Sequence, residues 1–399
     1  MNRQIQDAYI VAATRTPVGK APKGSLRNTR PDDLLVAAIR GALAAVPSLD
    51  PAAIEDAIIG CAMPEAEQGM NMARNAVLYA GLPDTVAGCT VNRYCSSGLN
   101  AVAMAADRIR VGEADVMIAG GAESMSMVPM GGNRPLINPR MFEKEENLGI
   151  GFGMGITAEK VAAQWKVGRE AQDAFALESH RRAIAAQQAG EFRDEITPFE
   201  IVEHAADLAA GKTEVRKRMM DADEGPRADT SAEALAKLKP VFAAKGSVTA
   251  GNSSQTSDGA GALILASEAA VRRFNLAPLA RFVAFSVKGV PPHIMGIGPK
   301  EAIPAALRAA GLQQDDMAWI ELNEAFAAQA LAVIDSLGLD RGRVNPLGGA
   351  IALGHPLGAT GAIRAATLVH GLRRRAQRYG MVTMCVGTGM GAAGIFERV

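Results

Sequence analysis

Cysteine is scarce in this chain, whose 399 residues include four: Cys61, Cys89, Cys95 and Cys385. None forms a C-x-x-C pair, and no Cys/His cluster has zinc-ligand spacing, so we expect neither a disulfide framework nor a metal site. The start of the chain has neither the long apolar segment of a signal peptide nor an Arg- and Ser-rich presequence. Together these features fit a reducing compartment, and we expect a cytoplasmic location.

Excess charge and long apolar runs are missing as well. The chain has 42 basic and 42 acidic residues, which gives no net field to attract nucleic acid or an anionic membrane. No apolar run approaches the length needed to cross a bilayer. Aromatic residues make up 4% and hydrophobic residues 48%, which predicts an aliphatic core packed tightly with Ala and Gly. An anionic ligand must therefore bind through local charges.

Convincing nucleotide-binding motifs are also absent. The stretch Gly389 to Gly394 formally matches G-x-G-x-x-G, but only Ile395 to Val399 follow it, which is too short for the helix that this motif requires. No G-x-x-x-x-G-K-[ST] loop occurs. We expect these glycines to allow close backbone approach beside Cys385.

What the sequence does contain is an alternation of strand-like and helix-like apolar runs. Residues 8–13 (AYIVAA) and 54–60 (IEDAIIG) are strand-like, whereas residues 32–46 (DDLLVAAIRGALAAV) have helical spacing. This alternation is typical of an α/β fold with a central, largely parallel sheet.

The second half repeats the first. Residues 299–311 (PKEAIPAALRAAG) correspond to the first helix, and Cys95 to Leu99 correspond to His355 to Ala359, each pentapeptide opening an Ala-rich helix. We infer a duplicated α/β unit. Equivalent helix N-termini of the two units would then converge on one site, with Cys95 facing His355.

The proposed division of the chain follows from this repeat. Residues 1–124 with 250–274 form the N-terminal core unit, and residues 275–399 form the C-terminal one. Residues 125–249 differ in composition from both units. The segment is rich in Met, Pro and charged residues at first, and a stretch with helical spacing follows. We interpret this segment as an inserted loop or lid domain.

Cys95 is the first candidate for chemistry, because it lies at a small-residue turn just before the helical run 101–110. The positive end of a helix lowers a thiol pKa and favours the reactive thiolate. From this segment alone a buried structural cysteine is an equally good interpretation. His355 and Cys385, which lie in glycine-rich turns near the end of the chain, favour the reactive cysteine.

Four motifs resemble those of the thiolase family over essentially the whole chain: VNRYCSSGLNA (91–101), NEAFAAQ (323–329), GGAIALGHPLGATGA (348–362) and CVGTGMGAA (385–393). The resemblance implies a duplicated α/β core of five layers, α-β-α-β-α, with an inserted loop domain. It also implies cleavage of a 3-ketoacyl-CoA by CoA to acetyl-CoA and a shortened acyl-CoA, as in fatty-acid β-oxidation, reversible as a Claisen condensation. CoA would be a substrate, and no cofactor would be needed.

The resemblance assigns a role to each catalytic residue. Cys95 is the nucleophile that carries the acyl group in a ping-pong mechanism, since a thiolate is both a good nucleophile and a good leaving group. His355 accepts its proton and helps to hold the enolate. Asn323 orients a water at that enolate, and Cys385 protonates the carbanion and then deprotonates the incoming CoA. The backbone N–H groups of Cys95 and Gly387 hold the acyl oxygen.

The resemblance also places residues along the CoA tunnel. An exposed Arg is usually only a solvated charge, so the role of Arg227 at the nucleotide is left open. The full set matched by position is Arg227, Phe242, Ala250, Ser254, Ala325, Phe326 and Met154. His180, in the charged run LESHRRA, is expected instead to be solvated or hydrogen-bonded.

One departure bears on the substrate. Short-chain biosynthetic members of the family have a His where this chain has Gly153. A missing imidazole opens room near the acyl thioester and favours a degradative thiolase for longer acyl chains over an acetoacetyl-CoA thiolase. Chain length and physiological direction stay open.

Other classes remain as alternatives. A decarboxylating condensing enzyme would use a Cys with two His, and does not explain Asn323 and Cys385. A non-catalytic acyl-CoA-binding protein or complex subunit has no need to keep Cys95, Asn323, His355 and Cys385 together. The family is oligomeric, so we expect a homodimer or homotetramer, with a β-oxidation hydratase/dehydrogenase subunit as a conceivable partner.

Overall fold

The computed structural model describes residues 5–207 and 211–399 of the chain. Ten strands form one large sheet in the order β10-β11-β12-β9-β1-β8-β5-β3-β4, with β2 beside β8. Its strands are β1 (Ala8–Arg15), β2 (Gly19–Lys20), β3 (Asp56–Gly60), β4 (Ala87–Val91), β5 (Val116–Ser124), β8 (Ser257–Ser267), β9 (Ala280–Gly289), β10 (Met317–Leu322), β11 (Tyr379–Val386) and β12 (Met390–Arg398).

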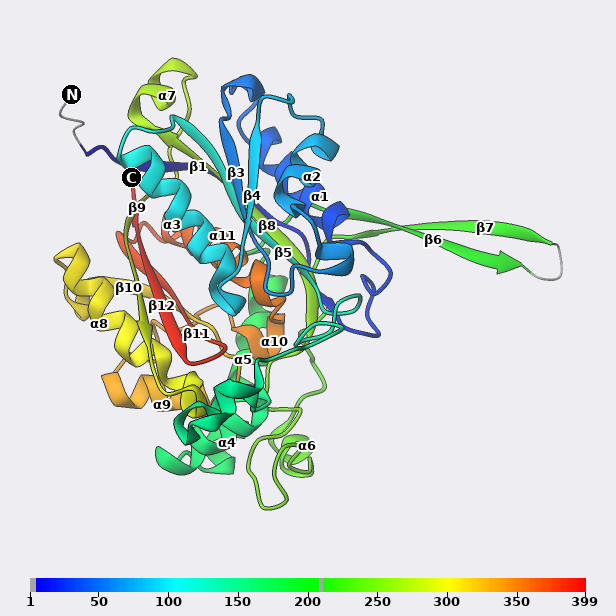
Figure 1. The fold of residues 1–399 in the computed structure, drawn as a ribbon, viewed down its shortest axis with the longest axis vertical. Coiled ribbons are helices and arrows are strands. Elements are labelled where there is room, and N and C mark those ends of the chain that lie inside the picture. Colours follow the sequence, from blue (N-terminus) through cyan, green and yellow to red (C-terminus); the bar gives the residue numbers. More distant parts are fainter. Residues whose placement is uncertain (1–4, 208–210) are drawn as a thin grey trace.

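The sheet consists of two half-sheets, one from each half of the chain (Figure 1). Among the described strands, the two half-sheets pair at β1 and β9 alone, at Tyr9–Arg281 and Ile10–Ala280. β8 pairs with both β1 and β5, so it returns to the first half-sheet after the inserted segment. We therefore propose to keep the domain division made from the sequence.

Helices cover both half-sheets and fill the space between them. The helices are α1 (Pro31–Ala44), α2 (Met72–Ala80), α3 (Ser97–Arg110), α4 (Met154–Gln164), α5 (Arg169–Gln188), α6 (Ala232–Ala236), α7 (Glu268–Arg273), α8 (Gly298–Ala310), α9 (Ala327–Leu337), α10 (Ala350–Leu353) and α11 (Thr360–Arg374). α1 and α2 pack on the first half-sheet, α8 and α9 on the second, and α3 and α11 lie between the two. This is the predicted α-β-α-β-α layering.

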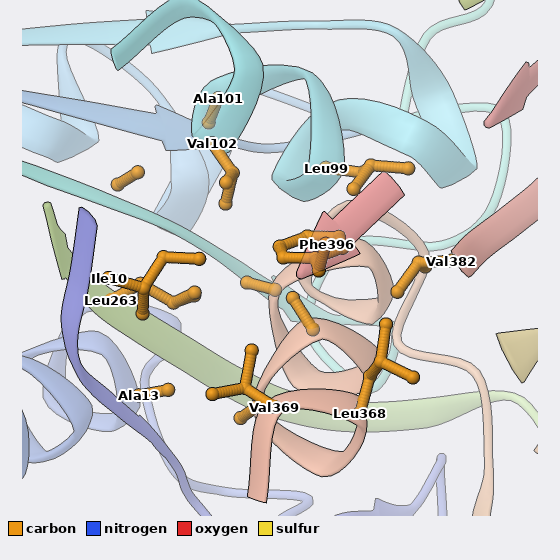
Figure 2. Packing of buried hydrophobic residues seen from close by; sticks show 14 of the residues in the cluster. Ile10, Ala13, Leu99, Ala101, Val102, Leu263, Leu368, Val369, Val382 and Phe396 are labelled. Carbon is orange, nitrogen blue, oxygen red and sulfur yellow. The ribbon is translucent and has the colours of Figure 1, made fainter. Parts of the chain in front are cut away.

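The central layer holds the two halves together. Leu99 and Val102 of α3 and Leu368 and Val369 of α11 are buried against strands of both half-sheets, as Figure 2 shows. Burying such aliphatic side chains contributes roughly 1.5–3 kcal/mol each. The aliphatic core expected from the low aromatic content is therefore found here, with Phe282 and Phe396 as an edge-to-face aromatic pair.

The expectation of a largely parallel sheet is wrong. Only β3–β4, β3–β5 and β10–β11 pair in parallel among the described strands, and the other pairs are antiparallel. β12 follows β11 after the short turn Gly387–Gly389, and a strand that follows so short a turn must run back beside its predecessor. The apolar composition of these fully buried strands does not reveal their direction.

The inserted segment is more than a loop. α4 and α5 pack against α9, while β6 (Phe199–Asp207) and β7 (Lys212–Met220) form a two-stranded hairpin that projects from the body (Figure 1). This hairpin was not predicted from the sequence. In the described parts of the chain, no helix is long and apolar enough to cross a membrane.

Buried ion pairs tie the insertion to β1. Arg15 is 2% exposed, and its guanidinium lies 2.6 Å from Glu195 and 2.7 Å from Asp223. These carboxylates raise its pKa above the usual value despite burial. The side chain also lies over the Phe192 ring. One cation therefore fixes two separate parts of the insertion to the first half-sheet.

We expect Arg15→Met to lower the free energy of unfolding by about 3–5 kcal/mol, because it leaves Glu195 and Asp223 buried without their cation. Denaturant unfolding followed by circular dichroism measures the change. Arg216→Met is the matched control, since Arg216 pairs with Glu214 at an exposed position and its loss leaves the midpoint unchanged. Equal midpoints for the Arg15 variant and the wild type would contradict this account.

Candidate active site

Cys95 lies in a tight turn directly before α3, as the sequence predicts. Residues Tyr94 to Ser96 form a 3-10 turn in which Tyr94 has φ +44°, an uncommon value for a residue with a side chain. The Ser97 hydroxyl donates to the Tyr94 carbonyl at 2.7 Å, and Asn92 Oδ1 accepts from the Tyr94 N–H at 2.8 Å. Side chains of the motif 91–101 thus stabilise the strained turn that positions the Cys95 sulfur.

The thiol itself is buried, with 8% of the residue exposed. Burial raises the pKa of Cys95 to about 12, although the N–H groups of Gly387 and of Cys95 itself act to lower it. The expectation that the helix end lowers this pKa is therefore wrong for the enzyme at rest. Desolvation outweighs the favourable backbone dipoles, so at neutral pH Cys95 is a thiol and needs a base.

His355 is that candidate base. It lies between α10 and the turn that opens α11, and it is 4% exposed. Its Nε2 lies 3.3 Å from Asn323 Nδ2, and its Nδ1 lies 2.6 Å from Thr360 Oγ1. Burial, together with the charge of Arg364, lowers the pKa of His355 to about 3. The imidazole is therefore neutral at pH 7 and able to accept a proton.

Cys385 provides a second thiol at the end of β11. It is fully buried, and burial together with the neighbouring Cys95 sulfur raises its pKa. The turn that follows places Gly387 against the Tyr94 ring: a Cβ at Gly387 would lie 3.5 Å from that ring. The hairpin β11–β12 thus carries both Cys385 and the Gly387 N–H to the Cys95 turn.

Close helix contact brings the two halves of the site together. A Cβ at Gly98 would lie 2.8 Å from the Gly358 carbonyl oxygen, and one at Gly361 would lie 2.2 Å from the Leu99 nitrogen. The first turns of α3 and α11 therefore touch backbone to backbone. The buried carboxylate of Glu123 joins the two halves further, since it accepts from the N–H groups of Ala62 at 2.7 Å and Gly358 at 2.8 Å. The convergence predicted from the repeat is found.

Asn323 lies between β10 and α9, where its N–H donates to the Thr383 carbonyl at 2.9 Å. Its Oδ1 is buried, and no described residue donates to it. Buried polar atoms of this kind are normally satisfied by water. The next residue, Glu324, accepts from Ser179 at 2.6 Å and from Asn345 at 2.8 Å, which fixes the loop.

Two of the predicted CoA residues share a cavity of about 320 Å³. Arg227 and Ala250 line it together with Lys20, His180 and Gln255, and the Gln255 carbonyl accepts from the His355 N–H at 3.3 Å. The cavity wall therefore reaches the catalytic candidates. The Arg227 side chain is 58% exposed and pairs with Asp229 at 3.1 Å.

The other predicted CoA residues do not line this cavity. Met154, Ala325 and Phe326 belong to the apolar cluster around Cys385. Phe242 packs edge-to-face on Phe326 with centroids 6.1 Å apart, and the Ser254 N–H donates to the Ala325 carbonyl at 2.9 Å. The structure thus gathers the seven residues into two groups rather than one cavity.

Sequence reasoning missed the position of His180. It was expected to be solvated or hydrogen-bonded, and the hydrogen bond is found: Nδ1 accepts from the Arg227 N–H at 3.2 Å. However, the residue is 5% exposed, lines the same cavity as Arg227, and burial lowers its pKa to about 4. The charged run around it gives no signal of this burial.

Comparison with known proteins agrees with this geometry. Residues 8–269 match the family described as thiolase, N-terminal domain, and residues 276–398 match thiolase, C-terminal domain. A 3-ketoacyl-CoA thiolase of Bacillus subtilis is 52% identical over 98% of this chain and 100% of its own length. The human mitochondrial 3-ketoacyl-CoA thiolase structure superposes with a TM-score of 0.88 at 40% identity, covering 99% of each chain. The Bacillus anthracis acetyl-CoA acetyltransferase structure superposes with a TM-score of 0.89 at 39% sequence identity, covering 100% of each chain.

Together with these relatives, a buried thiol that bonds to the Gly387 N–H and lies beside a second thiol identifies an acyltransferase on a duplicated α/β core. With both family regions matched in order, the chain belongs to the thiolase family.

Proposed function

We propose that this enzyme cleaves 3-ketoacyl-CoA with CoA to give acetyl-CoA and an acyl-CoA shortened by two carbons. The observation that carries the proposal is the Cys95 thiol, which lies beside Cys385 and the Gly387 N–H. Relatives named 3-ketoacyl-CoA thiolase at 52% and 46% identity over nearly the whole chain support this substrate class and a role in β-oxidation. We propose CoA as substrate, with no separate cofactor.

The first half-reaction begins with proton transfer from Cys95 to His355 Nε2. The thiolate adds to the 3-keto carbon, and its oxygen takes the negative charge between the N–H groups of Cys95 and Gly387. When the C2–C3 bond breaks, its electron pair moves into the acetyl-CoA enolate. The Nε2–H of His355 and a water bound to Asn323 Oδ1 hold the enolate oxygen, and the orphaned Oδ1 supports that water. Cys385 then protonates C2.

The second half-reaction returns the enzyme to its starting state. The Cys385 thiolate takes the proton of incoming CoA, whose sulfur attacks the acyl-Cys95 thioester. Cys95 leaves as a thiolate and recovers its proton from His355. Each residue ends as it began, which a ping-pong cycle requires.

The test is a thiolysis assay with CoA and 3-ketoacyl-CoAs from four carbons upward. Higher kcat/KM for longer chains supports the proposal, whereas turnover of acetoacetyl-CoA alone indicates the acetoacetyl-CoA thiolase alternative. Binding of acyl-CoA without any turnover would instead identify a non-catalytic protein. A decarboxylating condensing enzyme is disfavoured, because Asn323 and Cys385 lie at the site.

We expect Gly153→His to lower kcat/KM for a 3-ketoacyl-CoA of ten carbons at least about tenfold relative to acetoacetyl-CoA. A Cβ at Gly153 meets nothing within 4 Å, and its φ of −60° suits any residue, so the imidazole fills open space without backbone strain. Gly153→Ala is the matched control and keeps the wild-type preference. An unchanged ratio in the His variant would show that this position does not set chain length.

We further propose a homodimer or homotetramer in the cytoplasm. β4 ends the sheet order, and its outer edge carries the exposed residues Ala87 and Cys89. Proteins normally cover such edges, and a second copy is one way to do so. Light scattering measures the oligomeric state.

A β-oxidation hydratase/dehydrogenase subunit is a further proposed partner. Co-purification from cells that make both chains tests this association.

A further inference from the structure

Thr360 makes a contact at the site that none of the assigned roles uses. It is the first residue of α11, is 1% exposed, and its Oγ1 lies 2.6 Å from His355 Nδ1. The same hydroxyl donates its only proton to the Pro356 carbonyl at 3.2 Å. A hydroxyl that has donated elsewhere can only accept from the imidazole. With the hydroxyl proton on Pro356, this contact favours a proton on Nδ1.

The opposite side of the ring gives the same result independently. Asn323 Nδ2 lies 3.3 Å from His355 Nε2, and an amide nitrogen only donates. In this orientation of the amide, the contact favours Nε2 as the acceptor, without a proton. Both contacts select one tautomer, and it is the one whose free nitrogen can take the Cys95 proton.

We propose that Thr360 is a positioning residue that fixes His355 in the Nδ1–H tautomer and so keeps Nε2 free to act as the base. This inference rests on the proposed acyl transfer through Cys95. Without the hydroxyl, the Nδ1–H group would be buried with no partner, and the ring would favour the Nε2–H tautomer. That tautomer cannot accept the thiol proton.

The Thr360 hydroxyl also stabilises His355 after the imidazole has taken the Cys95 proton. The imidazolium carries protons on both nitrogens, and Thr360 accepts from Nδ1–H in that state as well. The charge that acts on the ring is that of Arg364, which disfavours the imidazolium, while the buried Glu123 carboxylate and Cys385 act on the Cys95 sulfur or its neighbours. No carboxylate bonds to either ring nitrogen among the described residues, so the threonine hydroxyl holds the place that a carboxylate takes in many triads.

The first experiment needs no substrate. Protein labelled with ¹⁵N-histidine is examined in ¹H–¹⁵N correlation spectra, with the His355 signals assigned by their loss in His355→Gln. We expect the wild type and Thr360→Ser to show protonated Nδ1 and bare Nε2, and Thr360→Val to shift toward Nε2–H. A wild-type spectrum with protonated Nε2 overturns the proposal whether or not any variant folds.

The second experiment follows iodoacetamide labelling of Cys95, quantified on its peptide, between pH 6 and 8. We expect little change with pH in the wild type, because transfer of the Cys95 proton to His355 inside the site exchanges no proton with solvent. Thr360→Val should label about 10- to 100-fold more slowly at pH 6 and speed up as pH rises, with a parallel loss of kcat.

Thr360→Ser separates the hydroxyl from the methyl group. We expect it to restore labelling and kcat to near wild type, with CoA binding unchanged in all three proteins. A serine variant as impaired as the valine one, or a valine variant equal to wild type, overturns the proposal. Failure of the wild type to turn over 3-ketoacyl-CoA would refute the proposed function while leaving the tautomer result intact.

Discussion

Cys95→Ser is expected to abolish thiolysis, with a loss of at least about 10⁴-fold in kcat, because a serine hydroxyl is neither activated by a weak base nor a leaving group toward CoA. The substitution replaces sulfur by oxygen at a buried position and keeps the donors around it. CoA binding therefore stays close to wild type. Initial rates of 3-ketoacyl-CoA cleavage and calorimetric titration with CoA measure the two quantities.

Cys89→Ser is the matched control for that experiment. Cys89 lies exposed on β4, whereas Cys95 is buried at the site, so a general effect of thiol loss would appear in both variants. We expect the Cys89 variant to turn over at the wild-type rate. Activity retained in Cys95→Ser would remove the nucleophile assignment, and equal losses in both variants would point to instability.

Gly361→Ala is the second substitution with a large expected effect. The added Cβ would lie 2.2 Å from the Leu99 nitrogen and 2.9 Å from the Leu99 Cα, so α11 must move away from α3. Such overpacking against backbone costs about 1–3 kcal/mol or more and separates the turns that carry His355 and Cys95. We expect either insoluble protein or a folded variant with less than about a hundredth of the activity.

Gly168→Ala provides the comparison for this change. A Cβ there meets nothing within 4 Å, and its φ of −71° is open to any residue. Thermal unfolding and kcat of the two variants, measured side by side, separate close helix packing from a general intolerance of Gly-to-Ala changes. Wild-type stability and activity in Gly361→Ala would show that α3 and α11 do not need backbone contact.

The repeat in the sequence predicted much of the fold and the meeting of the helix N-termini that follow Cys95 and His355. Both residues precede helices of equal character, and the glycines at 98 and 361 let those helices touch. Motif spacing can carry this information because it is local to each half. The resemblance to the thiolase family, and not the repeat, indicated Gly387 as a donor at the site, and its N–H bonds to the Cys95 sulfur.

Other features depended on contacts between distant segments and were missed. The pKa of Cys95 is set by burial under both halves, which the local helix-end argument cannot weigh. Strand direction depended on β8 returning after the insertion, and the burial of His180 depended on packing beside Arg227. In the sequence, Thr360 is one residue of a glycine-rich turn, and nothing there indicates its contact with His355 Nδ1.

The central claim is that the acyl group passes through Cys95. The most direct measurement mixes the enzyme with a 3-ketoacyl-CoA in the absence of free CoA, quenches it in acid and maps the adduct by peptide mass spectrometry. The account predicts the shortened acyl group on the peptide that contains Cys95, and its disappearance when CoA is added before the quench. An acyl group on Cys385, or product formed with no covalent adduct, would contradict it.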